Sequence, residues 1–189
     1  MRRKHKKYIV GAEPVVAPHL LARQFEASAP NKKWFTDVTY LMFGERTLYL
    51  STIMDAFNRE IISWVLSESP NLQLSMDTLK QAMKGRNVEG VILHSDQGSI
   101  YTAKEFQMYA KEKGIITSMS RKGNYHDNAV MESFFGHLKS EAFYSQKLTK
   151  VSNTTVRKTV LEYIHYYNCV RIQEKLNYLS PKEFREQVV

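Results

Sequence analysis

The sequence predicts an α/β protein with a five-stranded mixed sheet, three antiparallel strands followed by two parallel ones, flanked by helices. Three observations predict this class. Three consecutive segments rich in β-branched and aromatic residues are joined by short turns. Two short apolar segments then alternate with helical patterns, and strand-helix-strand connections of this length imply parallel neighbours. Helical periodicity continues to the end of the chain.

The three antiparallel strands are expected at residues 34–43, 47–55 and 59–66. Each is rich in Val, Ile, Thr, Tyr, Phe or Trp, which are the residue types enriched in strands. Gly44 lies in the first turn, and residues 56–58 form the second. Because turns this short join antiparallel neighbours, the three strands should form a meander.

A helix with one buried face is expected after Pro70. Its apolar residues recur at spacings of 4, 3 and 4, and they are Leu72, Met76, Leu79 and Met83. Gly85 is expected to end this helix.

Two short strands and a helix between them should follow. Residues 91–93 are wholly apolar and predict the fourth strand. Residues 102–105 have the form of a capping box, which opens a helix that ends at Gly114. Residues 115–119 predict the fifth strand.

Two longer helices are expected in the last third of the chain. Asp127 is placed to cap the first, whose apolar residues are Val130, Met131, Phe134, Phe135 and Leu138. The second runs from about residue 152 to residue 168 and carries Val156, Val160, Ile164 and Tyr167 on one side.

The composition is that of a basic globular protein. Of the 189 residues 43% are apolar, enough to form a core, and 27 Lys and Arg against 19 Asp and Glu give a net charge of +8. This charge suggests a polyanionic partner such as nucleic acid. Five basic residues near the N-terminus predict either an arm that follows a phosphate backbone or simply a solvated terminus; they are Arg2, Arg3, Lys4, Lys6 and Lys7.

Several classes of protein are excluded by the sequence. No apolar run approaches the roughly 18 residues that a membrane span needs, and the charged N-terminus lacks the apolar core of a signal peptide. We therefore expect a soluble, cytoplasmic protein with no membrane partner. The single cysteine, Cys169, excludes an internal disulfide and a zinc site built on cysteine pairs, so a metal would be bound by carboxylates or histidines.

Three carboxylates differ from the acidic residues of the helix surfaces. Asp37 lies inside an apolar strand, where an unpaired charge is costly unless the side chain faces solvent or caps a loop. Asp96 follows a buried strand, a position where ligand sites collect but where turn aspartates are also common. Glu132 lies in a mainly apolar helix and is expected to project toward the sheet, unless it is an ordinary surface glutamate.

The combination of these carboxylates favours a site for divalent metal ions. Mg²⁺ takes one or two carboxylates per ion and keeps its other positions for water and phosphate. Two ions roughly 4 Å apart stabilise both the attacking and the leaving oxygen of a phosphoryl displacement. Three carboxylates can support two ions if one carboxylate bridges them.

Three motifs in this order resemble those of a known family: residues 33–40 (KWFTDVTY), 94–101 (HSDQGSIY) and 118–141 (SMSRKGNYHDNAVMESFFGHLKSE). Together they resemble the catalytic domain of bacterial insertion-sequence transposases of the OrfB type, relatives of the retroviral integrase core with a ribonuclease H-like fold. The resemblance implies a catalytic core over residues 31–145 and a helical extension of it over residues 146–189. Residues 1–30 are expected to be a basic arm or linker.

The resemblance also implies an activity and a set of partners. It describes a DDE transposase that cleaves DNA and transfers strands with two Mg²⁺ ions, for which Mn²⁺ can substitute. Asp37, Asp96 and Glu132 would be the catalytic metal ligands, and Lys139 would contact DNA near them. The implied partners are the element ends and the target DNA, bound by at least a dimer and associated with the bacterial nucleoid.

Two other interpretations stay open. A ribonuclease H-like nuclease would share the fold, and an inactive DNA-binding remnant of a mobile element would keep the basic surface without the chemistry. His94 is expected to support the site rather than to act as a general base. Asn128 and the loop before it, including Asn124 and His126, are implied to fix the helix start and shape the site.

Overall fold

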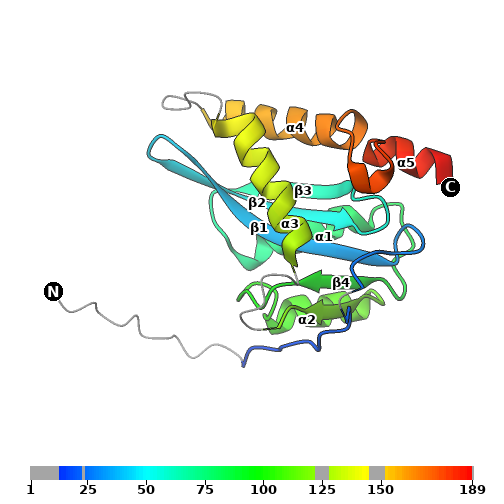
Figure 1. The fold of residues 1–189 in the computed structure, drawn as a ribbon. Helices are drawn as coiled ribbons and strands as arrows, with labels where there is room; N and C mark the ends of the chain where they lie inside the picture. Colours follow the sequence, from blue (N-terminus) through cyan, green and yellow to red (C-terminus); the bar gives the residue numbers. More distant parts are fainter. Residues whose placement is uncertain (1–12, 23, 122–127, 145–151, 189) are drawn as a thin grey trace.

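A five-stranded mixed sheet forms the centre of the protein (Figure 1) in a computed structural model that describes residues 13–22, 24–121, 128–144 and 152–188. The strand order is β3-β2-β1-β4-β5. The strands are β1 (Lys33–Phe43), β2 (Arg46–Asp55), β3 (Ile61–Ser67), β4 (Ile92–Ser95) and β5 (Ile116–Met119). The first three pair antiparallel, while β4 runs parallel to β1 and β5 runs parallel to β4, which confirms the predicted sheet.

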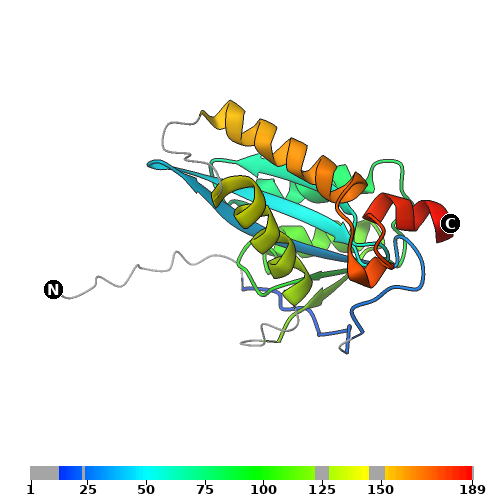
Figure 2. The same cartoon turned by 45° about the horizontal axis from the view of Figure 1, so that its top comes forward.

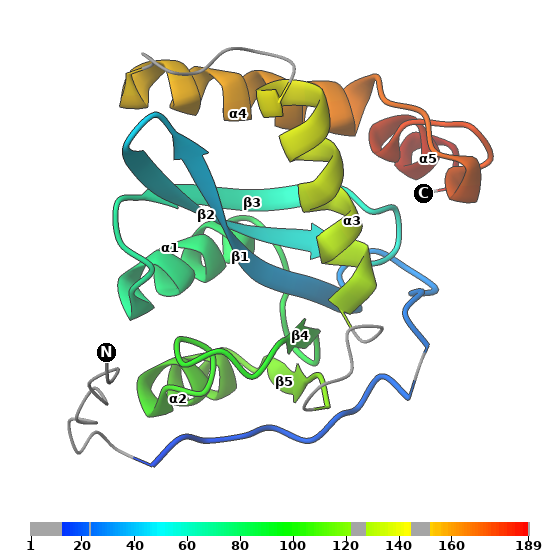
Figure 3. The same cartoon turned by 60° about the vertical axis from the view of Figure 1, so that its left-hand side comes forward.

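Helices cover both faces of this sheet. Figure 3 shows α1 (Leu72–Met83) and α2 (Lys104–Glu112) on one side, with α3 (Ala129–Leu138) crossing the sheet on the other. The π-helical segment η2 (Lys139–Tyr144) continues α3. In Figure 2, α4 (Asn153–Cys169) lies beside α3, and the short helices η3 (Glu174–Leu176) and α5 (Pro181–Val188) end the described chain.

The alternation of side chains along β1 separates two cores. Phe35, Leu41 and Phe43 belong to the core beneath α3 and α4. Trp34 belongs to the core beneath α1 and α2, because successive residues of a strand point to opposite faces. Asp37 shares the parity of Phe35 and therefore lies on the α3 face.

The predicted stripe of α1 packs against the core: Leu79 is buried, and Leu72, Met76 and Met83 are half-buried against it. The buried face also contains small and polar residues, including Thr78, whose carbonyl accepts a hydrogen bond from Ser63 Oγ at 2.7 Å. The predicted capping box of α2 is wrong. Ala103 caps α2 without a side-chain bond, and the Thr102 hydroxyl donates to the Gly98 carbonyl instead.

The predicted N-terminal caps of α3 and α4 can be compared with the structure only in part. Asp127 lies outside the described residues, and the N-cap of α3 is Asn128. The Ser152 side chain caps α4 by accepting a hydrogen bond from the Thr155 amide, which confirms the predicted start of that helix.

The segment before β1 lies along the β5 edge of the sheet, where Figure 3 shows it in dark blue. The Val15 amide donates to the Thr102 carbonyl at 2.8 Å, and the Met119 amide donates to Pro18 at 3.3 Å. Leu21 is buried in the core beneath α3 and α4. Arg2, Arg3, Lys4, Lys6 and Lys7, predicted to contact DNA, lie outside the described residues. No helix in the described ranges is both long and apolar enough to cross a membrane.

Candidate active site

Asp37 lies in the middle of β1, on the sheet face that α3 covers. Its Oδ1 accepts a hydrogen bond from the Val38 amide at 2.7 Å. Its Oδ2 accepts one from Asn128 Nδ2 at 2.8 Å. Because Asn128 is the N-cap of α3, this second bond ties the start of the helix to the centre of the sheet.

Asp96 lies beside Asp37 because of the parallel register between β1 and β4. Phe35 pairs with His94, and each aspartate lies two residues beyond its member of that pair. Asp96 Oδ1 accepts a hydrogen bond from the Gly98 amide at 2.9 Å, which orients the carboxylate at the end of β4. Residues 59 positions apart in the chain are thus neighbours at the same edge of the parallel pair.

Glu132 lies in the first turn of α3, and its side chain is exposed. The expectation that it projects toward the sheet is therefore wrong. Met131, Phe134 and Phe135 occupy the buried side of the helix and leave Glu132 on its flank. The charge of Glu132 nevertheless raises the pKa of Asp37.

The pKa of Asp37 is raised to about 7. Burial is the main cause, followed by the negative charge of Asp96 and, more weakly, that of Glu132. The hydrogen bonds from Val38 and Asn128 oppose the rise because they favour the ionised form. The three predicted carboxylates therefore share one electrostatic environment, with the half-buried Asp37 at its centre.

Lys139 is a cation whose charge interacts with Asp37. It is the first residue of η2, beyond the end of α3, and its Nζ lies 4.5 Å from the centroid of the Tyr40 ring. Burial lowers the pKa of Lys139, while the attraction of Asp37 opposes that change. Tyr40, which is exposed, was missed by sequence reasoning; the available signal was an aromatic residue three positions after Asp37 in the same strand.

Two buried polar side chains, His94 and Tyr101, lie near the aspartates. The His94 ring lies between two hydroxyls of the β5 segment, with Nδ1 2.9 Å from Ser118 Oγ and Nε2 3.2 Å from Ser120 Oγ. This geometry is consistent with the supporting role expected for His94. Tyr101 is fully buried, and its hydroxyl lies 3.2 Å from Thr36 Oγ1. Burial, together with the charge of Asp37, raises the Tyr101 pKa.

The donor set fits a hard divalent cation, with one restriction. Within the described ranges, no three His, Cys, Asp or Glu side chains are grouped tightly enough to hold one metal ion together. Mg²⁺ requires only one or two carboxylates per ion, however, and an electrostatically crowded aspartate is stabilised by such a charge. Asp37, Asp96 and Glu132 are therefore the side chains that could hold such a cation.

Comparison with known sequences identifies the family. Residues 27–125 and 132–189 each match a model described as an integrase core domain. The chain is 49% identical over 172 residues to the InsK protein of insertion sequence element IS150 of Escherichia coli, covering 90% of this chain and 60% of that protein. It is 39% identical over 187 residues to the transposase for insertion sequence element IS904 of Lactococcus lactis, covering 98% of this chain and 73% of that one.

Solved structures have the same fold. The HTLV-2 integrase catalytic core domain in complex with magnesium superposes with a TM-score of 0.67 at 15% identity, over 85% of this chain and 99% of that one. The simian T-cell lymphotropic virus intasome chain gives a TM-score of 0.74 at 14% identity, over 93% of this chain and 60% of that one. The predicted ribonuclease H-like fold is thus confirmed, and the chain belongs to the integrase core domain family, with insertion-sequence transposases as its relatives.

Proposed function

We propose that this protein catalyses metal-dependent cleavage and strand transfer of DNA for an insertion sequence. The raised pKa of Asp37 carries the proposal, because a half-buried carboxylate crowded by two others is the arrangement that a divalent cation stabilises. Family membership supports the same chemistry, since the relatives are named as transposases.

Each residue of the site has a specific role in this proposal. Asp37, Asp96 and Glu132 would together hold two Mg²⁺ ions. When bound, the ions supply activation of the attacking oxygen and stabilisation of the leaving 3′ oxygen. Asn128 orients the Asp37 carboxylate through its 2.8 Å hydrogen bond. Lys139 would hold a DNA phosphate beside the carboxylates, which adds affinity but little sequence information.

The partners follow from the reaction. Strand transfer joins two element ends to a target, so a dimer or a larger assembly on DNA is part of the proposal. Mn²⁺ should replace Mg²⁺, because both ions accept carboxylate and water ligands.

The test is cleavage of labelled duplex DNA that carries the ends of the element. With Mg²⁺ or Mn²⁺ we expect a free 3′ hydroxyl and joined products from the wild-type chain. Asp96→Asn should abolish both products and leave DNA binding in EDTA within about twofold of wild type. Asp77→Asn is the matched control, since Asp77 lies on α1 at the opposite face of the sheet.

The outcomes separate the competing functions. Nicking by the Asp96→Asn protein at the wild-type rate would disprove the assignment of this carboxylate. Cleavage of an RNA–DNA hybrid but not of duplex DNA would indicate a ribonuclease H-like nuclease instead. DNA binding without any carboxylate-dependent uptake of Mn²⁺ in calorimetry would indicate an inactive remnant.

A further inference from the structure

A groove lies along one flank of α3, on the other side of the helix from Glu132. Its volume is about 230 Å³, and Ser133 and His137 of α3 line one wall. The opposite wall comes from the β2–β3 turn, through Arg59, and from the segment after α4. That segment contributes Arg171, Lys175 and one acidic residue, Glu174.

Arg59 adopts a backbone conformation that an arginine rarely takes. Its φ is +60°, in the left-handed region where glycine or asparagine is favoured. Such strain persists only where the surroundings determine the conformation, and it is concentrated at functional positions. A large cation at this strained position therefore indicates a role beyond forming the turn.

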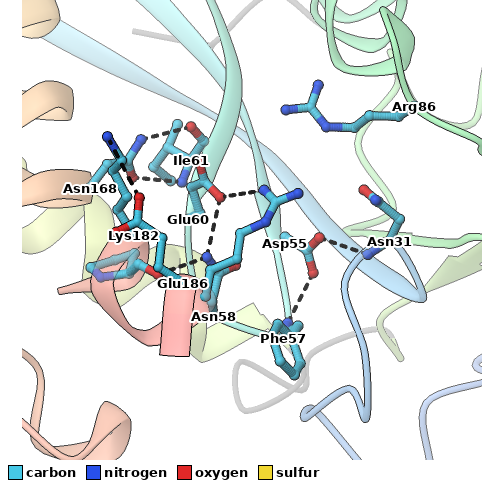
Figure 4. A network of polar contacts seen from close by, with 12 residues as sticks. Asn31, Asp55, Phe57, Asn58, Glu60, Ile61, Arg86, Asn168, Lys182 and Glu186 are labelled. Carbon is cyan, nitrogen blue, oxygen red and sulfur yellow. Dashed lines mark hydrogen bonds and ion pairs between the residues drawn. The ribbon is translucent and has the colours of Figure 1, made fainter. Parts of the chain in front are cut away.

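The neighbours of Arg59 hold the turn firmly (Figure 4). The Asp55 side chain accepts hydrogen bonds from the Asn31 and Phe57 amides, at 2.8 and 3.0 Å. Asn58 Nδ2 donates to the Pro181 carbonyl at 2.9 Å, which links the turn to α5. On the far side, Asn168 both donates to and accepts from the backbone of Ile61. The turn thus presents Arg59 from a rigid base.

The cations of the groove differ in whether their charge is already compensated. Arg171 forms an ion pair with Glu141 at 2.9 Å. The Arg59 guanidinium and the Lys175 ammonium make no hydrogen bond or ion pair within the described part of the chain. Glu174 faces the same groove, so the two free cations outnumber the free carboxylate.

We infer that this groove binds a backbone phosphate of duplex DNA, with Arg59 and Lys175 as its principal ligands. At about 230 Å³ the groove is smaller than the roughly 300–1,000 Å³ sites that take drug-sized ligands, and it is open on one side, which suits a phosphate on a continuous backbone. Arginine presents a fork of donors that matches phosphate oxygens. The inference rests on the proposed function, and it adds a second anchoring point for DNA, separate from the carboxylates.

The experiment measures binding of the full chain to a 30-base-pair duplex by fluorescence anisotropy in EDTA, over a range of KCl concentrations. Each phosphate contact contributes about 0.9 to the slope of log K against log salt. Arg59→Gln/Lys175→Gln should reduce the slope by about 1.8 and the affinity at 0.1 M KCl by at least about tenfold. Lys84→Gln/Lys111→Gln removes the same charge from exposed positions at the ends of α1 and α2, and should leave the slope close to wild type.

Two further variants separate binding from folding. Arg59→Gly should unfold at or above the wild-type temperature, because glycine accepts a φ of +60°, and should still lose about 0.9 of the slope. Lys175→Gln changes an exposed side chain alone and should lose a similar amount.

Three results would overturn the inference. An unchanged slope in all the groove variants would overturn the groove site. If these variants still cleave DNA as wild type does, the proposed function would remain supported. The control variant could lose as much of the slope as the groove variant, which would show only an effect of net charge. Failure of the wild-type chain to bind duplex DNA would reject the groove and the proposed function together.

Discussion

The replacement Asp37→Asn should stabilise the metal-free protein at neutral and alkaline pH. An Asp with its pKa raised from 3.8 to about 7 prefers to be protonated in the folded state, so its ionisation opposes folding. The difference between the two pKa values corresponds to about 4 kcal/mol, at about 1.4 kcal/mol for each factor of ten in the ionisation equilibrium. An asparagine carries no charge and should avoid this cost.

The pH dependence follows from the direction of the shift. Below the pKa of the unfolded chain, about 4, Asp37 is protonated in both states and the cost is absent. The cost grows as the pH rises from about 4 to about 7 and is complete above that range. We therefore expect Asp37→Asn to be more stable than wild type by up to about 4 kcal/mol at pH 8, and by less than about 1 kcal/mol at pH 4.

The site can accept the asparagine without losing a hydrogen bond. Asn128 Oδ1 is buried and makes no hydrogen bond among the described residues. Rotation of the Asn128 amide would present this acceptor to the new NH₂ group at residue 37, while the single remaining side-chain oxygen at residue 37 still accepts from the Val38 amide. The comparison therefore isolates the charge of Asp37.

Urea unfolding in EDTA at pH 4, 6 and 8 measures the effect, with the exposed Glu45→Gln as a matched loss of one negative charge. Saturating Mg²⁺ should raise the stability of wild type and leave Asp37→Asn nearly unchanged, because the ligand of the ion is lost. An equal free energy of unfolding for the two proteins at pH 4 and pH 8, or a less stable Asp37→Asn at pH 8, would refute the reasoning.

Three further substitutions test the packing and geometry of the site. Phe134→Ala should lower the free energy of unfolding by about 3–5 kcal/mol, because the ring is buried; urea unfolding measures this, and a loss below about 1 kcal/mol would contradict the packing. Asn168→Ala removes two hydrogen bonds to the Ile61 backbone and should cost about 2–3 kcal/mol, whereas an unchanged melting temperature would speak against that link. Gly98→Ala places a Cβ 2.9 Å from Asp96 Oδ1, so DNA cleavage should fall by about 100-fold while the melting temperature changes little; wild-type cleavage would show that Asp96 tolerates the shift.

The sequence by itself determined the kinds of elements and their order, because the periodicity of apolar residues reports local burial. The β-branched and aromatic residues around Asp37 identified β1, and the spacing of Val156 and Val160 identified α4. The identities of the three carboxylates were also visible, since residues 33–40, 94–101 and 118–141 form a recognisable set of motifs.

Local sequence patterns did not predict the hydrogen-bond partner of a side chain where several partners were possible. Thr102 and Glu105 have the spacing of a capping box, but the Thr102 hydroxyl bonds to the Gly98 carbonyl in a turn that the pattern does not describe. Asn128 has a residue type typical of an N-cap, yet its amide reaches across to Asp37. Both outcomes depend on the backbone that folding brings nearby.

The tertiary structure decided the electrostatics of the site. The register between β1 and β4 places Asp96 beside Asp37, and burial beneath α3 then raises the pKa of Asp37. The rotation of α3 leaves Glu132 exposed, and the β2–β3 turn holds Arg59 at a positive φ beside the same helix. Distances between remote segments depend on strand register and helix packing, which residue periodicity does not encode, and these distances set the charge interactions on which the proposed chemistry depends.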